Sequence, residues 1–335
     1  MAYIIPQKRL SMNPQASQAP RLSPERERHI SPPKRVSMDP QAFQSPRLPP
    51  ELERQIFELC ALSRPFFVSR LMLVAWRVRE WVTPILYHTI AISRASSPML
   101  DAFSQYISTK SPQYMKNRCF PSFRNAVHIH NLYIGFLDAY LFEFLHSYPA
   151  AKNLYINARI MDRSIALRFA DFTPTRLYST DQFFTLLLAP HPFFSQITHL
   201  ELIACLDHKV LLKRIPLLPR LTHLSFRDPR LIDISPRLLR TCASLSVLIH
   251  LPRAKEIELH RMNGRALTSL SKDFRFVYMP LKAHLGDWLA GARWGTDYWS
   301  RAEAFIAKRR AGEIDELQFM LFDDEDLECI EEKDT

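Results

Sequence analysis

The sequence predicts a mixed α/β protein: a short helical module, then a domain of repeated strands, then a capping helix. Three observations support this fold class. Apolar residues recur at helical spacing between residues 47 and 90, and a leucine pattern recurs about every 24 residues further along the chain. A helix with recognisable start and stop signals follows residue 299. With 47% hydrophobic and 23% charged residues among 335, the chain can build a core of ordinary size.

Residues 1–46 are rich in proline, serine, glutamine and arginine and contain few large apolar side chains. They include most of a tandem duplication, since residues 8–30 and 34–56 are identical at 16 of 23 positions. Such a composition cannot offset the entropy lost on ordering, so we expect a disordered tail. Ser11 and Ser37 each follow a Lys-Arg-x sequence and are candidate phosphorylation sites, unless these serines occur there by chance.

Residues 47–90 predict short helices. Pro49-Pro50 can open a helix, because N–H groups in the first helical turn have no partner within the helix and proline's lack of one costs nothing there. A first apolar face follows at helical spacing, and a second helix is predicted from Val68 to Val82. Thr83-Pro84 would begin a third helical turn.

This segment resembles an F-box, the helical motif of the large fungal F-box families. The resemblance rests on Leu48-Pro-Pro-Glu-Leu-x3-Ile-Phe, on Leu71-x2-Val74 and on Trp81-Val-Thr-Pro-Ile-Leu-Tyr87. It departs from the family where Val78 replaces the expected tryptophan. The resemblance implies docking on the Skp adaptor of a cullin-type (SCF) ubiquitin ligase. The adaptor-binding residues would be Leu48, Pro49, Leu52, Ile56, Phe57, Leu71 and Val74. The alternative is an unrelated three-helix packing unit.

Residues 91–282 predict a leucine-rich-repeat-like α/β solenoid. Ile197–Leu202 and Leu221–Phe226 share the template L-x-x-L-x-L, and related segments place their central residues at 127, 154, 177, 200, 224 and 248. These steps fall in the range of leucine-rich repeats. Each unit would contribute one strand and a return segment, and a closing strand is expected at Phe274–Tyr278. A globular α/β domain without repeat symmetry is the alternative.

The strand pattern also predicts a surface for a protein target. If Leu200 and Leu202 point inward, alternation turns the intervening side chains outward on the concave face. The predicted target-binding residues are His128, His130, Tyr155, Tyr178, His199, Glu201, His223, Ser225 and Arg227. Repeat solenoids commonly bind partners on that face.

Residues 283–312 predict a C-terminal cap. Aromatic residues between Asp287 and Trp299 would seal the open end of the solenoid. Ser300 and Glu303 form a candidate capping box, and Gly312 is a stop signal. Residues 313–335 carry eleven acidic side chains and one basic, and we expect them to form a disordered acidic tail.

Charge and composition limit the function classes. The chain has a net charge of +10, so the 312 residues before the acidic tail carry +20. That bias suits acidic partners and solubility, and nucleic-acid binding is not expected without a recognisable module. Five scattered cysteines without a C-x-x-C pair indicate a reducing compartment, cytoplasmic or nuclear. The sequence contains no run of about 18 apolar residues, so it predicts no membrane span.

The sequence contains no signature of a hydrolase, metalloprotease, nucleotide-binding protein or kinase. The chain has only 6 glycines, and this low number also argues against a glycine-rich phosphate loop. We therefore expect a non-enzyme without cofactor or metal. Two hypotheses follow: a substrate-receptor subunit that joins the Skp adaptor and cullin complex to an unidentified protein target, or a non-catalytic scaffold whose basic body binds nucleic acid without any ligase connection.

Overall fold

The computed structural model describes residues 48–64, 67–93, 105–108, 127–135, 148, 150–156, 172–181, 191–203, 207–252, 264–281 and 283–322. The chain divides into two units, Met1–Arg47 and Leu48–Thr335, and all described residues belong to the second. The predictions for the tandem-duplicated tail, including Ser11 and Ser37, lie outside the described residues, as does most of the acidic tail.

Three helices follow Leu48: α1 (Pro50–Ser63), α2 (Val68–Leu71) and α3 (Trp76–Tyr87). Pro50 starts α1, and two glutamates in its first turn suit the positive end of the helix dipole. The three helices share a small core of four buried side chains. These are Ala61, Val68, Val78 and Val82.

The prediction of one continuous helix from Val68 to Val82 is wrong. The chain turns between α2 and α3, where Ala75 has extended backbone angles (φ −160°, ψ 156°). A continuous helix would hold Val74 and Val78 on one face, whereas this break leaves Val74 exposed and buries Val78. Pro84 lies inside α3 and does not begin a new helix.

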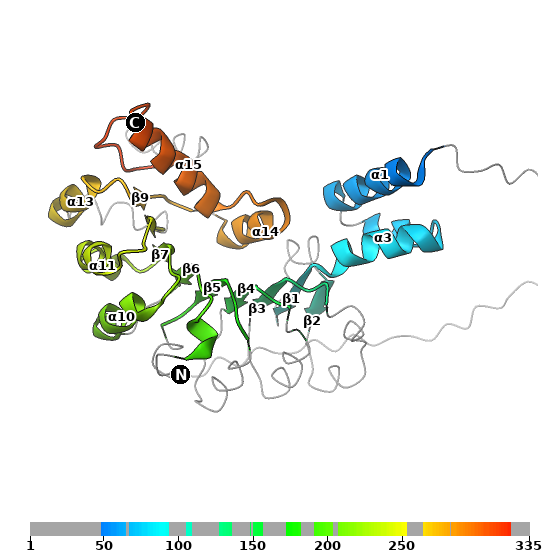
Figure 1. The fold of residues 1–335 in the computed structure, drawn as a ribbon, viewed down its shortest axis with the longest axis horizontal. Helices are drawn as coiled ribbons and strands as arrows, with labels where there is room; N and C mark the ends of the chain where they lie inside the picture. The colour runs from blue at the N-terminus through cyan, green and yellow to red at the C-terminus, as the bar shows by residue number, and fades with distance from the viewer. Residues whose placement is uncertain are drawn as a thin grey trace, which may run out of the picture. The chain divides into compact units, whose positions relative to one another are not determined.

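Nine parallel strands in the described residues form one sheet, in the order β2-β1-β3-β4-β5-β6-β7-β8-β9 (Figure 1). They are β1 (Thr89–Ser93), β2 (Gln105–Ser108), β3 (Asn131–Ile134), β4 (Asn153–Ile156), β5 (Arg176–Ser179), β6 (His199–Leu202), β7 (His223–Phe226), β8 (Val247–His250) and β9 (Phe276–Tyr278). The predicted α/β class and the closing strand are confirmed. From β3 to β8, one leucine per strand occupies the same register position. These are Leu132, Leu154, Leu177, Leu200, Leu224 and Leu248.

The first predicted unit was misplaced. Leu132, not Val127, aligns with Leu154 in the neighbouring strand, and Val127 lies in a turn with 62% of its surface exposed. Val127 and Ile129 alternate as strand residues do, but only Ile129 is buried in the core, and the strand itself begins at Asn131. Residues 105–108, which lie outside the leucine template, form the edge strand β2.

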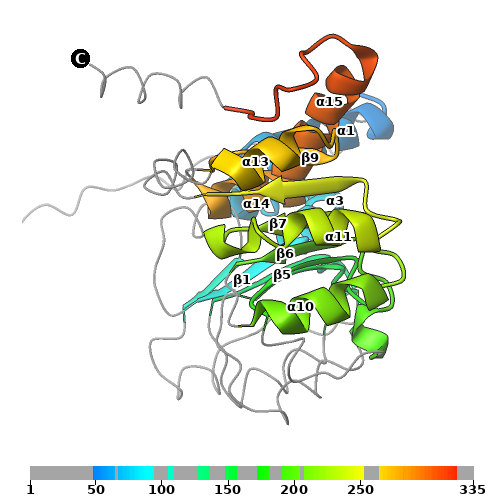
Figure 2. The same ribbon diagram turned by 90° about the vertical axis from the view of Figure 1, so that its left-hand side faces the viewer.

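The leucine face of the sheet is covered by α10 (His208–Arg214), α11 (Ser235–Thr241) and α13 (Gly264–Ser271). Figure 2 shows these helices in front of the strands. Short 3₁₀ turns accompany them, namely η3 (Pro192–Phe194), η4 (Ile215–Leu217) and η5 (Pro229–Leu231). The register leucines, together with Phe193, Leu211 and Leu238, form the larger hydrophobic core on this face.

The opposite face of the sheet is covered by α14 (His284–Trp294) and α15 (Tyr298–Ala311) (Figure 1). The expectation that this aromatic region seals the end of the domain is therefore wrong, because Trp288 and Trp299 pack against strand residues such as Tyr178 across the sheet face. Asp297, not Ser300, caps α15 by accepting a hydrogen bond from Ser300 N (3.0 Å). Gly312 ends the helix with φ 73°, as predicted.

A row of hydroxyl groups runs across the sheet just before its strands begin. Thr198 Oγ1 donates to Thr175 O (3.1 Å), Thr222 Oγ1 to Thr198 O (3.2 Å), and Ser246 Oγ to Thr222 O (3.0 Å). Each hydroxyl thus finds its acceptor in the previous unit and adds a side-chain hydrogen bond to a carbonyl that already accepts backbone N–H groups.

The chain returns to the sheet after α15. Tyr278 N donates to Phe319 O (2.8 Å) and Leu321 N to Tyr278 O (2.9 Å), so Met320 forms a parallel bridge beside β9. Arg309, buried in α15, donates to four backbone carbonyls of the surrounding segments and so fixes this return. The acceptors belong to Ser271, Phe274, Phe276 and Glu316.

Candidate functional site

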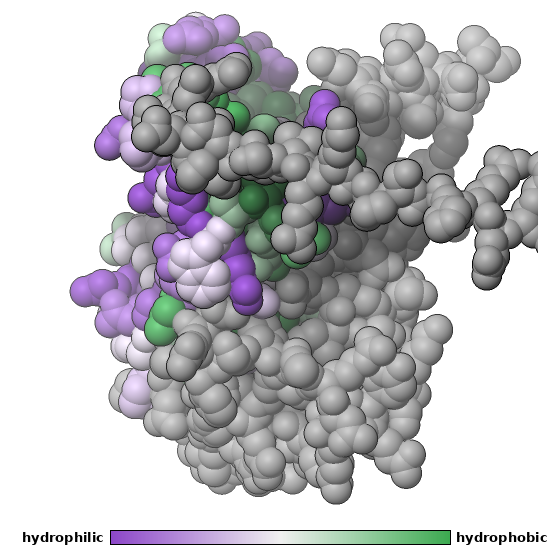
Figure 3. Space-filling model, turned by 90° about the vertical axis from the view of Figure 1, so that its right-hand side faces the viewer, coloured by the Kyte–Doolittle hydropathy of each residue, from purple (hydrophilic) through white to green (hydrophobic). Residues whose placement is uncertain are grey.

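An exposed apolar surface covers the helical module. The described part of the chain has thirteen large apolar side chains with high exposure, and eight of them fall between residues 48 and 76. We call these eight the module surface: Leu48, Leu52, Ile56, Leu59, Phe67, Leu73, Val74 and Trp76. The space-filling view in Figure 3, taken from the side where α1 and α3 lie in Figure 1, shows hydrophobic atoms between hydrophilic ones. Apolar concentrations of this kind mark interaction sites.

The structure brings the predicted adaptor-binding residues together on this module in two groups. Leu48, Pro49, Leu52, Ile56 and Val74 are exposed. Phe57 and Leu71 are half-buried and pack on the small core, where the Phe57 ring lies 6.5 Å from that of Trp81.

Sequence reasoning missed Leu73 and Trp76, which are 85% and 69% exposed. They protrude at the break between α2 and α3. A helical pattern read as continuous offers no signal for them, because the break is what turns them outward.

The second predicted site is largely closed. Tyr155, Tyr178, Glu201, His223 and Ser225 lie on the face opposite the leucines, as strand alternation requires, but they are buried. The reason is that α14 and α15 cover this face with Trp288, Tyr298 and Trp299. The prediction that these five residues form an open target-binding surface is wrong.

A buried polar cluster holds the covering helices to the strands. His284 Nε2 lies 2.7 Å from Glu201 Oε2, and Tyr298 donates its hydroxyl to the same oxygen at 2.7 Å. Ser225 Oγ lies 3.1 Å from the Tyr298 hydroxyl, and Tyr155 reaches His284 Nδ1 at 3.3 Å. Burial and the charge of Glu201 raise the pKa of Tyr298 well above 10, so Tyr298 remains a hydrogen-bond donor at neutral pH.

His199 and His223 stack at the margin of this cover, with ring centroids 4.0 Å apart and an interplanar angle of 7°. Both rings meet the edge of Trp299, and His223 Nε2 lies 2.8 Å from Glu303 Oε1. Burial, and after it the neighbouring His223 and Arg176, lower the pKa of His199 from 6.5 to about 2. Both rings are therefore neutral packing groups at physiological pH, since burial lowers the pKa of His223 as well.

Three predicted residues lie apart from the buried cluster. His128 and His130 precede β3, and the His130 ring lies 5.2 Å from that of His88, not beside His199. Arg227 follows β7 and is half-buried. The predicted histidine-bearing surface therefore does not form. Within the described ranges, no group of three or more His, Cys, Asp or Glu side chains is placed to hold a metal ion, and no described helix has the length and hydrophobicity to cross a membrane.

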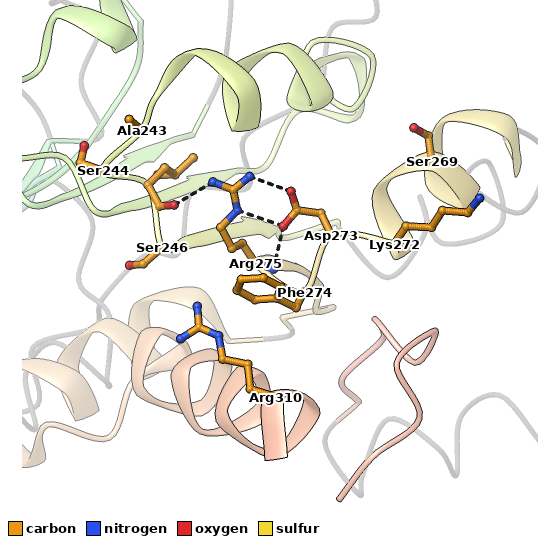
Figure 4. Close-up of a pocket in the computed structure, with 10 residues that line it drawn as sticks. Ala243, Ser244, Ser246, Ser269, Lys272, Asp273, Phe274, Arg275 and Arg310 are labelled. Carbon is orange, nitrogen blue, oxygen red and sulfur yellow. Dashed lines mark hydrogen bonds and ion pairs between the residues drawn. The ribbon is translucent and has the colours of Figure 1, made fainter. Parts of the chain in front are cut away.

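A pocket of about 570 Å³ opens at the β8–β9 end of the sheet (Figure 4). It lies between the start of β8, the turn that leads into β9, the end of α13 and the last turn of α15. We call it the cationic pocket. Its lining residues are Ala243, Ser244, Leu245, Ser246, Ser269, Lys272, Asp273, Phe274, Arg275 and Arg310.

Comparison of the chain with protein-family models gave no match, and comparison with the curated proteins gave none either. The functional argument therefore rests on the geometry of the module surface and of the cationic pocket.

Proposed function

We propose that this protein is a substrate-receptor subunit of a cullin-type ubiquitin ligase, which binds the Skp adaptor through residues 48–87. The module surface is the observation that carries the proposal. It contains Leu48, Leu52, Ile56 and Val74, four of the positions at which the F-box resemblance expects adaptor contact. None of these four side chains belongs to the small core or to the side chains packed against it.

The proposal extends to the strand domain as a series of degenerate leucine-rich repeats. The support is the shared register of one leucine per strand at steps of 22 to 24 residues from Leu132 to Leu248. The hydroxyl row from Thr175 to Ser246 repeats with the same steps. Such a domain would hold the protein target while partner subunits transfer ubiquitin.

The test is capture of the purified Skp adaptor by the full chain. Changing both Leu52 and Ile56 to glutamate should reduce capture at least tenfold, because two charges would enter an apolar contact. Both residues are 47% exposed, so the variant should unfold at the same temperature as the wild type.

Leu317→Glu is the matched control, since Leu317 is 60% exposed but lies outside the helical module. The control should capture the adaptor as the wild type does. Equal capture by the module variant and the wild type would overturn the F-box assignment. Binding of an oligonucleotide that weakens steeply with salt, without adaptor capture, would instead favour the scaffold hypothesis.

A further inference from the structure

The target face predicted from the strands is closed by α14 and α15, whereas the cationic pocket is open to a partner segment. It lies at β8 and β9, whereas the helical module leads into β1 near the other end of the strand order. A segment held there would leave the module surface open to a second partner.

The charge balance of the cationic pocket is positive. Arg275 donates to Asp273 from two nitrogens, Nε to Oδ1 (3.0 Å) and Nη2 to Oδ2 (2.7 Å), and it also donates to the carbonyls of Leu239 and Leu245. Burial opposes ionisation of Asp273, but the hydrogen bonds and charge of Arg275 outweigh it and lower the pKa of the carboxyl. The two charges cancel, which leaves those of Lys272 and Arg310.

Arg310 is positioned to receive an anion. Its guanidinium carbon lies 4.3 Å from the centroid of the Phe274 ring, and Figure 4 shows the two side chains together below Arg275. Stacking on an aromatic face holds a guanidinium flat, while its N–H groups remain at the edge for a paired contact with an oxyanion. No carboxylate of the described residues pairs with Arg310 or with Lys272.

The pocket also has an apolar part. Phe274 is 44% exposed, and the exposed Ala243 is a second apolar residue of the lining. The pocket is broadly open to solvent, and its volume of about 570 Å³ exceeds what a single small anion needs. The occupant should therefore combine an anionic group with adjoining apolar or peptide atoms.

We propose that the cationic pocket binds an acidic peptide segment of the protein target, with Arg310 contacting an oxyanion on one of its side chains and Lys272 adding positive charge to the lining. The target role rests on the proposed function, whereas the pocket chemistry stands on its own residues. Carboxylate and phosphate groups on a peptide share this chemistry, so the test includes both.

The test uses the full chain and three labelled twelve-residue peptides that differ only at three positions, which hold glutamate, phosphoserine or glutamine. Binding is followed by fluorescence anisotropy. The glutamate or the phosphoserine peptide should bind at least tenfold more tightly than the glutamine peptide. The tighter of the two anionic peptides identifies the preferred oxyanion. Arg310→Gln and Lys272→Gln should each weaken that binding, and together by at least tenfold.

Lys308→Gln is the matched control, because Lys308 is exposed on the same helix but does not line the pocket. It should change affinity less than twofold. Three results would overturn the inference: equal binding of the glutamine peptide, an equal loss with Lys308→Gln, or tighter binding of a single-stranded oligonucleotide of the same charge. Arg310→Gln should still capture the Skp adaptor. Capture without peptide binding would refute only this inference, and peptide binding without capture would refute only the ligase proposal.

Discussion

Glu201 has no solvent exposure and joins the sheet to both covering helices. Its carboxylate contacts His284 of α14 and Tyr298 of α15. Removing one partner of a buried, hydrogen-bonded pair leaves the others desolvated without compensation. We expect Glu201→Ala to lower the free energy of unfolding by about 3–5 kcal/mol, measured by urea denaturation.

The control for this prediction is Glu313→Ala, at an exposed position after α15. A surface change of this kind should stay within about 0.5 kcal/mol. If Glu201→Ala cost no more than this control, the polar cluster would not be what holds the helices to the strands.

His199 makes the stability depend on pH. Its pKa falls from 6.5 in the unfolded chain to about 2 in the fold, so below pH 6.5 the unfolded state binds a proton that the folded state does not. The stability that neutral His199 contributes is fully present above pH 6.5 and is lost as the pH falls below 6.5. Between pH 7 and pH 5.5 we expect His199 alone to remove about 1 kcal/mol of stability.

Denaturation curves at the two pH values check this expectation. His199→Gln cannot titrate, so the difference between its curves should be smaller than that of the wild type by about the same 1 kcal/mol. His88 and His223 also have lowered pKa values and should leave a residual slope in the variant. An unchanged pH dependence would contradict the assignment.

At the level of elements, the crossing of α14 and α15 depends on a missing side chain. A Cβ atom placed on Gly291 would lie 2.5 Å from the Cβ of Asp297, the residue that caps α15 and pairs with Arg176 at 2.7 Å. Gly291→Ala must therefore displace this cap. We expect a loss of roughly 1–3 kcal/mol, although alanine alone would favour the helix by about 1 kcal/mol.

Thermal unfolding measures this effect, with Ala290→Gly as the comparison, since that change in the same helix should cost only about 1 kcal/mol of helix propensity. Stabilisation by Gly291→Ala would show that α14 and α15 are not in close contact at this point.

The strands from β4 to β8 were predictable because their leucines recur in one template, and each lies where its spacing requires. Val127 was mistaken for the first unit because alternation alone does not fix register. The break before α3 was not predicted, since the apolar spacing from Leu71 to Val78 fits a continuous helix equally well.

The same limit applies to the sites. Strand alternation correctly placed Glu201 and Tyr178 opposite the leucines, but it carries no information about what covers that face. The cover comes from α14 and α15, about 100 residues further along the chain. The module surface was easier to predict, because Leu52 and Ile56 depend only on the spacing within one helix. The cationic pocket, assembled from residues 243–246, 269–275 and 310, left no local signal.

In the described unit as a whole, the module surface and the cationic pocket lie near opposite ends of the strand order. The module surface belongs to helices that lead into β1, and the cationic pocket to the loops around β8 and β9. Under the proposed function, this separation would let the adaptor and the target bind at the same time. The buried cluster lies at strands between the two features.

The segment around Met320 also has a measurable role at this scale. A chain cut after Gly312 would lack Phe319–Leu321, and the backbone groups of Tyr278 would lose their partners. We expect this shortened chain to form dimers and larger species, measured by light scattering during size-exclusion chromatography. A chain cut after Phe322 keeps the segment and should elute like the full-length protein. Equal elution of the two shortened chains would contradict the expectation.

The bridge of Met320 beside β9 limits how far the sheet can grow on that side. Every parallel strand offers its neighbour a row of free N–H and C=O groups, so a series of similar units has no natural last member. Here the chain supplies its own last member, a three-residue segment held in place by the carbonyl contacts of Arg309. The protein thereby covers the β9 edge of its sheet with backbone that follows the final helix.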